Sequence, residues 1–184
     1  MPGSASQPLR PHPATPGLAG DRLTVDYHLA PAGIELHYRF RGDPATLRLP
    51  SRQAAGPADG LWRHTCCEAF VAAVAAAAAP GYREFNFSPS GQWAVYRFAD
   101  YRQRADGDSP PAPLPPIGFS RRPDGFDLRA TLPRALLPAG PLQLGLSAVI
   151  ERADGGKDYW ALAHDSEQAD FHRRQSFIIH LSQP

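Results

Sequence analysis

The sequence predicts an all-β fold, a jelly-roll-like sandwich of two antiparallel sheets with about nine or ten strands and little helix. The chain of 184 residues contains 21 prolines and 16 glycines, which interrupt it at short intervals. The segments between these breakers are short and mostly alternate apolar with polar residues, as half-buried strands do. No period repeats along the chain. Together these observations favour strands and loops over a helical bundle.

The first 20 residues are predicted to form a disordered arm in front of a single domain over residues 21–184. Residues 1–20 are rich in Pro, Gly, Ser and Ala, a composition typical of flexible segments, and they lack the apolar stretch of a secretory signal peptide. A chain of this length fits one domain and can bury roughly 70% of its unfolded surface without disulfides.

The predicted domain begins with a hairpin. The segments RLTVDYHL (22–29) and IELHYRFRG (34–42) alternate apolar and polar residues, and PAG at 31–33 separates them. ATLRLP (45–50) is expected to be a short strand that ends at Pro50. EAFVAAV and the alanines that follow it allow two interpretations, a helix from alanine propensity or a strand from alternation. We favour the strand, and the sequence leaves open whether residues 75–79 are helical.

Two further hairpins and two late strands are expected in the rest of the chain. YREFNFSPSGQWAVYRFADYR (82–102) predicts a hairpin with a type I turn at SPSG, and IGFSRRPDGFDLRATLP (117–133) predicts another. A proline-rich loop, 104–116, separates them. LQLGLSAVIE (142–151) and SFIIHLS (176–182) predict two late strands. The residues between these strands form a long polar and aromatic segment.

Composition excludes some classes of function. The formal net charge is only +1, without the basic excess typical of nucleic-acid-binding proteins, and no apolar run is long enough to span a membrane. Cys66 and Cys67 are adjacent, and adjacent cysteines seldom bridge each other. We interpret them as reduced thiols, which fits a cytoplasmic protein. The protein is expected to be a monomer or a weak dimer.

Candidate binding residues gather in the aromatic segments. In the 82–98 hairpin, one face carries Phe85 and Phe87 and the other carries Glu84 and Asn86. Aromatic faces bind the C–H edges of sugars, while carboxylates and amides hold the hydroxyl groups. The sequence predicts a ligand pocket with the following lining: Trp62, His64, Glu68, Glu84, Asn86, Trp93, Tyr96, His164, Asp170 and His172.

The histidines leave two alternatives open. Asp170 and His172 share one face of an extended segment, and either His64 or His164 would complete a site of two histidines and one carboxylate for a metal. The same groups could instead act as acid and base in an enzyme. Their spacing matches no dedicated zinc motif.

Three blocks of the sequence resemble the bacterial DOMON-like domain proteins, in the superfamily that joins DOMON domains to family-nine carbohydrate-binding modules. The blocks are DGLWRHTCCEAFV (59–71), YREFNFSPSGQWAVYRFADYR (82–102) and YWALAHDSEQADFHRRQSF (159–177). The resemblance covers residues 23–181. It implies a β-sandwich with a pocket for a sugar or a haem. In the superfamily pattern a Trp precedes an acidic residue that opens a strand, as Trp62 and Glu68 do here, and the next strand carries Glu84, Asn86 and Ser88.

The chain departs from the haem-binding pattern of the superfamily. Haem-binding DOMON domains commonly use a Met and a His as iron ligands, and the single methionine here is Met1. Ligation by two of His64, His164 and His172 is the alternative that remains. The cofactor therefore stays open, with haem and a divalent metal both compatible and neither favoured.

The expected function is non-catalytic binding of a small ligand, a sugar or sugar derivative. The alternatives are an enzyme that uses histidine and carboxylate chemistry in the same pocket, with or without a metal, and a haem-binding module with bis-histidine ligation. Neither a nucleic acid nor a membrane is an expected partner.

Overall fold

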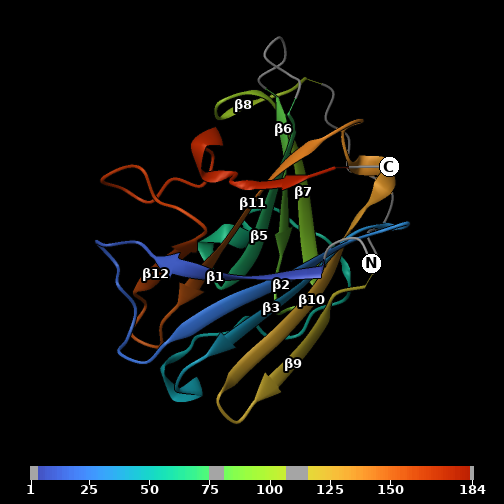
Figure 1. Ribbon diagram of the computed structural model, residues 1–184. Coiled ribbons are helices and arrows are strands. Elements are labelled where there is room, and N and C mark those ends of the chain that lie inside the picture. The colour runs from blue at the N-terminus through green and yellow to red at the C-terminus, as the bar shows by residue number, and fades with distance from the viewer. Residues whose placement is uncertain (1–3, 75–80, 107–115, 183–184) are drawn as a thin grey trace.

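The computed structural model describes residues 4–74, 81–106 and 116–182, which form an all-β fold (Figure 1). The thirteen strands are β1 Ser4–Pro11, β2 Arg22–Ala30, β3 Gly33–Arg41, β4 Gly56–Pro57, β5 Cys66–Ala73, β6 Tyr82–Phe87, β7 Gln92–Asp100, β8 Gln103–Arg104, β9 Gly118–Arg122, β10 Gly125–Pro133, β11 Leu142–Glu151, β12 Lys157–Ala161 and β13 Ile179–Leu181. Within the described ranges the helical elements are four 3-10 turns, η1 Pro44–Thr46, η2 Leu61–Arg63, η3 Arg134–Leu136 and η4 Arg174–Ser176. The predicted all-β class is therefore confirmed.

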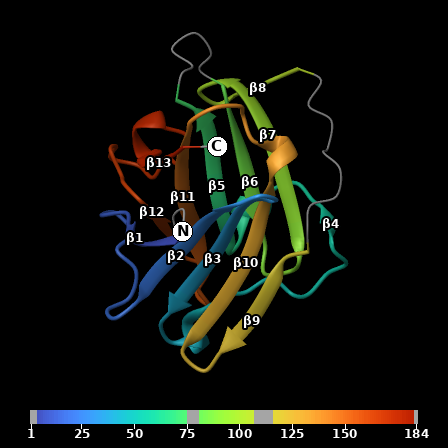
Figure 2. The ribbon, with the colours of Figure 1, turned by 45° about the vertical axis from the view of Figure 1, so that its right-hand side comes forward.

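The strands follow one continuous hydrogen-bonded path, β4-β7-β6-β5-β11-β12-β1-β2-β3-β10-β9, while β13 pairs with β11 and β8 with β7. The short β4–β7 pairing is parallel and the other described pairings are antiparallel. The path curves, so that β5 and β6 lie behind β2, β3 and β10 in Figure 2, where β7 lies to the right of β6. Strand β1 joins the two parts, because residues 4–9 pair with β2 and residues 10–11 pair with β12.

The main apolar core lies between these two groups of strands. Both groups contribute fully buried aromatic side chains, namely Tyr38, Phe40 and Phe126 from one group and Phe85 and Phe87 from the other. The Tyr38 hydroxyl crosses the core and donates a hydrogen bond of 2.6 Å to the backbone carbonyl of Glu68. Burial of apolar area on this scale is the main stabilising contribution to such a fold.

The prediction of a disordered arm over residues 1–20 is wrong for residues 4–20. Ser4–Pro11 is strand β1. Its Leu9 belongs to the main core and is 4% exposed, and His12, directly after the strand, is also buried. Pairing on both sides explains this order, because β1 fills the gap between β2 and β12. Composition alone could not reveal it, since the stabilising partners lie far away in the sequence.

The three predicted hairpins are confirmed as β2–β3, β6–β7 and β9–β10. In the β6–β7 turn, the Gly91 amide donates to the Ser88 carbonyl at 3.0 Å, as the predicted turn requires. Strand β5 confirms the strand interpretation of residues 66–73, and residues 75–79 lie outside the described residues. Cys66 and Cys67 are buried free thiols, as expected.

Two predictions about strands need correction. Residues 45–50 contribute only one isolated bridge, between Leu47 and Arg152, because the preceding residues form a 3-10 turn capped by Asp43. The polar segment after β11 contains the short strand β12, which the sequence analysis missed.

Candidate ligand-binding site

The two faces of β5 and β6 differ in the chemistry of their side chains. On the inner face, Ala69, Val71 and Phe85 belong to the main core. The outer face carries Glu68 and Glu84 beside a second apolar cluster, which includes side chains from residues 58–62 and 171–177. Because these two segments pack over the outer face, its polar groups are buried as well.

A row of three polar side chains crosses this outer face. Asn86 of β6 pairs in register with Glu68 of β5, which pairs with Ser147 of β11. Their exposed fractions are 0%, 3% and 2%, respectively. Each has an oxygen without a hydrogen-bond partner in the described protein, Asn86 Oδ1, Glu68 Oε1 and Ser147 Oγ. Unpartnered buried polar groups are rare and costly, so three in one row indicate a surface built to receive a polar ligand.

Glu84 lies next to this row and is joined to it, because Asn86 Nδ2 donates to Glu84 Oε1 at 2.9 Å. Burial raises the pKa of Glu84 to about 7, against the opposing effect of the bond from Asn86. Burial, with the nearby Glu84 carboxylate as a second cause, also raises the pKa of Glu68 well above its ordinary value. A protonated carboxyl can donate as well as accept, which suits the hydroxyl groups of a sugar.

Glu68, at the centre of the row, lines a cavity of about 370 Å³, which we call the outer pocket. It is lined by Trp62, Arg63, Glu68, Glu84, Tyr96, Phe98, Arg102, Arg104, Val149, Lys157, Tyr159, Ala169, Phe171 and His172. The Trp62 and Tyr96 rings meet edge to face, with centroids 5.8 Å apart. The Tyr96 hydroxyl donates to Asp59, which holds the ring in place. This combination of aromatic walls and a few polar groups is typical of small-molecule sites.

His172 contributes an imidazole to the same pocket. Its Nδ1 lies 2.7 Å from the Tyr82 hydroxyl, and its Nε2 lies 3.7 Å from Glu84 Oε2. Burial, with Arg102 as a second cause, lowers the pKa of His172 to about 4, so the ring is neutral near pH 7. Asp170 stays outside the lining, where it accepts hydrogen bonds from Tyr101 and Arg102.

The structure therefore brings Trp62, Glu68, Glu84, Tyr96 and His172 together in the lining, and Asn86 is bonded to Glu84. It separates Trp93, His64 and His164 from them. Trp93 was expected beside Tyr96, but it packs in the main core on the opposite face. His64 is bonded to Glu151 at 2.8 Å, and His164 is bonded to the Arg10 carbonyl at 2.9 Å, next to His12. Trp93 is thus removed from the candidate site.

Several lining residues were missed by sequence reasoning. Four are basic, Arg63, Arg102, Arg104 and Lys157, and the aromatic residues Tyr159 and Phe171 join them. Tyr159 and Phe171 lie in a block already singled out for its aromatic content, so their type was a usable signal. The basic residues gave no signal, because a nearly balanced net charge conceals a local excess.

The residues present do not fit the haem or metal alternatives. His64, His164 and His172 have three different sets of partners, and the neutral His172 is already bonded to Tyr82. Across residues 4–74, 81–106 and 116–182, no group of three or more His, Cys, Asp or Glu side chains is arranged to hold a metal ion.

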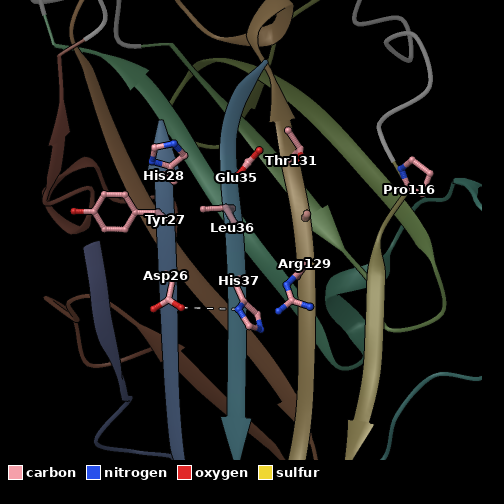
Figure 3. A pocket seen from close by; sticks show the side chains of 10 residues that line it. Asp26, Tyr27, His28, Glu35, Leu36, His37, Pro116, Arg129 and Thr131 are labelled. Carbon is pink, nitrogen blue, oxygen red and sulfur yellow. Dashed lines mark ion pairs between the residues drawn. The ribbon is translucent and has the colours of Figure 1, made fainter. Parts of the chain in front are cut away.

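A second cavity, of about 280 Å³, lies on the outer face of β2, β3 and β10 (Figure 3). Its lining includes Asp26, His28 and His37, which Figure 3 shows on neighbouring strands. Asp26 is already paired there with Arg39 at 2.6 Å. This cavity has one aromatic residue, Tyr27, and no tryptophan in its lining. The outer pocket is therefore the better candidate for sugar binding.

The sequence matches no protein-family model and no curated protein. Among solved structures, the fold is similar to a crystal structure from Bacteroides uniformis of a protein provisionally named as carbohydrate-binding. The TM-score is 0.63 at 15% sequence identity, and the match covers 95% of this chain and 84% of the other. At this identity the likeness establishes a shared all-β fold. In the described part of the chain, no helix is both long and apolar enough to cross a membrane.

Proposed function

We propose that the chain is a non-catalytic binding domain whose outer pocket holds a sugar or sugar derivative. The observation that supports this proposal most is the row formed by Asn86, Glu68 and Ser147. Each member of the row has an unpartnered oxygen, and Glu68, the middle member, lines a cavity with aromatic walls. Sugar hydroxyls would satisfy these oxygens, and a sugar ring would lie against Trp62.

The similarity to the Bacteroides uniformis protein supports the proposal at the level of the fold. We further propose that the chain is a member of the DOMON-like group. In that interpretation, the strands on either side of β1 are the two sheets of its sandwich, and residues 4–182 belong to a single domain. The buried free thiols Cys66 and Cys67 are consistent with a reducing compartment, and we propose the cytoplasm.

Calorimetric titration with a panel of mono- and disaccharides tests the proposal. Trp62→Ala should weaken the binding of any sugar that binds by at least about 1 kcal/mol, because an aromatic contact is lost. Trp93→Phe is the matched control, since Trp93 packs in the core, and it should leave the affinity unchanged. The proposal fails if no member of the panel binds, or if Trp62→Ala binds as tightly as the wild type.

One observation favours an enzyme as the second candidate. The chain of contacts from Tyr82 through His172 to Glu84 puts an imidazole and a carboxyl group of pKa about 7 in one pocket. A general acid or base works best with a pKa near the working pH. Incubation of the bound sugar's nitrophenyl glycosides with the protein distinguishes the two candidates. Release of nitrophenol that Glu84→Gln abolishes would support the enzyme, and intact glycoside would support binding alone.

A further inference from the structure

The charged groups around the outer pocket are distributed unevenly. The two carboxyl groups in the lining, Glu68 and Glu84, lie on the strand floor, where they are buried. The four cationic groups in the lining are Arg63, Arg102, Arg104 and Lys157. The pocket thus has a rim with more positive than negative groups, although the whole chain is almost neutral.

Two of the four cations are engaged by neighbours. Arg102 pairs with Asp170 at 2.9 Å. The Arg104 guanidinium lies over the Tyr96 ring, 3.9 Å from its centroid, with Asp59 at 3.7 Å. These contacts fix the two arginines on the side of the pocket formed by β7 and β8.

The other two cations, Arg63 and Lys157, have no carboxylate within ion-pair distance in the part of the chain that the structure describes. Lys157 opens β12, opposite Glu151 of β11. The Glu151 carboxylate is already held by His64 at 2.8 Å and by Arg48 at 3.6 Å. Arg63 directly precedes His64 in the chain, and both unpaired cations line the outer pocket.

We propose that the ligand of the outer pocket is an anionic sugar derivative, whose phosphate or carboxylate group is bound by Arg63 and Lys157. This inference rests on the proposed function, since the sugar ring would lie against Trp62 and reach Glu68. An oxyanion accepts charge-assisted hydrogen bonds from guanidinium and ammonium groups, which are stronger than neutral ones. Burial favours the protonated form of Glu68, whereas Glu84, with a pKa of about 7, is partly ionised near neutral pH, so the anion has to be held at the cationic rim and away from the floor.

The test compares matched ligands: glucose, glucose 1-phosphate and glucuronate, the same set built on galactose and mannose, and inorganic phosphate. Titration calorimetry at low and at high salt measures each affinity. We expect an anionic member of one set to bind at least tenfold more tightly than its neutral parent sugar. The advantage should shrink in high salt, since partly exposed ion pairs are screened. Whether the phosphate or the carboxylate member binds identifies the oxyanion.

Two variants test whether the tighter binding of the anionic sugar depends on the cationic rim residues. In Arg63→Gln and Lys157→Gln, the affinity for the anionic member should fall toward that of the neutral parent sugar. Arg121→Gln is the matched control, since Arg121 is an exposed residue of β9 outside the pocket, and it should keep the full advantage. Thermal unfolding of each variant establishes that it is folded during the titration.

The possible failures are distinguishable. If neutral and anionic sugars bind equally, or if both rim variants keep the advantage, the anion inference is wrong and sugar binding stands. If no sugar of either kind binds, the proposed function fails together with the inference. If inorganic phosphate binds as tightly as the sugar phosphate, the ring contributes nothing and the sugar-derivative assignment is overturned.

Discussion

Strands β5 and β6 have two faces that are about equally buried, but only the outer face combines apolar side chains with buried polar groups. On the inner face, Val71 and Phe85 are fully buried among apolar partners. On the outer face, Glu68 and Asn86 are almost as inaccessible, yet each keeps an oxygen without a partner in the described protein. Burial alone therefore does not separate core from site. The distinguishing feature is whether the buried groups are satisfied by the fold.

The two faces are therefore expected to have different roles, the inner face in stability and the outer face in ligand binding. Inner-face side chains stabilise the fold through apolar burial, and their loss should unfold the chain. Outer-face polar groups cost free energy when they are buried without partners, so the fold should tolerate their loss while ligand affinity falls. Residues that are costly to the fold are the expected members of a binding site.

The largest effect is expected on the inner face. Phe85→Ala should lower the free energy of unfolding by about 3–5 kcal/mol, because it removes a fully buried ring that stacks on Phe87 and leaves a cavity. Urea unfolding followed by tryptophan fluorescence measures the change. A loss below about 1 kcal/mol would show that this side of the sheet is not the core.

The second effect is a pH dependence that arises on the outer face. The pKa of Glu84 rises from 4.5 in the unfolded chain to about 7 in the folded chain, so its contribution to stability is present below pH 4.5 and is lost as the pH rises through 7. Glu84→Gln removes this loss, and its unfolding free energy should exceed that of the wild type progressively above pH 5, by up to about 3 kcal/mol.

The difference between variant and wild type is the quantity to measure, because His172 acts in the opposite direction. Its pKa, lowered to about 4 from 6.5, contributes stability above pH 6.5 that is lost as the pH falls through 4. The two dependences partly cancel in the wild type. A stability difference that stays flat between pH 4.5 and pH 8 would contradict the burial of Glu84.

The third prediction concerns Glu68, which lies on the outer face of β5 next to the inner-face Ala69. It tests directly whether outer-face polar groups serve binding and not stability. Glu68→Leu should leave the unfolding free energy unchanged or raise it, since a buried carboxyl group with an unpartnered oxygen is replaced by an apolar group. Sugar affinity should fall at least about tenfold, or about 1.4 kcal/mol. A variant that unfolds easily and whose folded fraction still binds normally would make Glu68 a structural residue.

The smallest effect is expected at Tyr38, a core residue whose hydroxyl bonds to the backbone of Glu68. Tyr38→Phe removes the hydrogen bond to the Glu68 carbonyl and should cost about 1 kcal/mol of stability. Because this bond holds β5 from the core side, ligand affinity should change by less than about twofold. Urea unfolding and calorimetry on the same sample test both parts. A large loss of affinity would mean that the core contact positions Glu68 for the ligand.

Local patterns predicted much of the fold and part of the site. Alternation placed Glu84 and Asn86 on one face and Phe85 on the other, as the structure has them. The same rule explains the error at Trp93, since it lies three residues before Tyr96 and an odd separation puts two strand residues on opposite faces.

Other features depend on pairing between distant segments. Strand β1 is ordered by β2 and β12, and neither partner is detectable from the composition of the first 20 residues. Ser147 lies in a mostly apolar strand, and only the register of β11 with β5 places it beside Glu68. Arg63 and Lys157 are far apart in the sequence and meet at one pocket only in the folded chain.

The most direct test of the sugar pocket uses the three tryptophans of the chain as internal reporters. Trp62 lines the outer pocket, whereas Trp93 and Trp160 are buried in the main core. The three indole N–H signals in a ¹H–¹⁵N spectrum can be assigned with single Trp→Phe variants and followed during a titration with the sugar panel. We predict that a binding sugar shifts the Trp62 signal and leaves the other two in place. Saturable binding that shifts Trp93 or Trp160 while Trp62 stays fixed would contradict it.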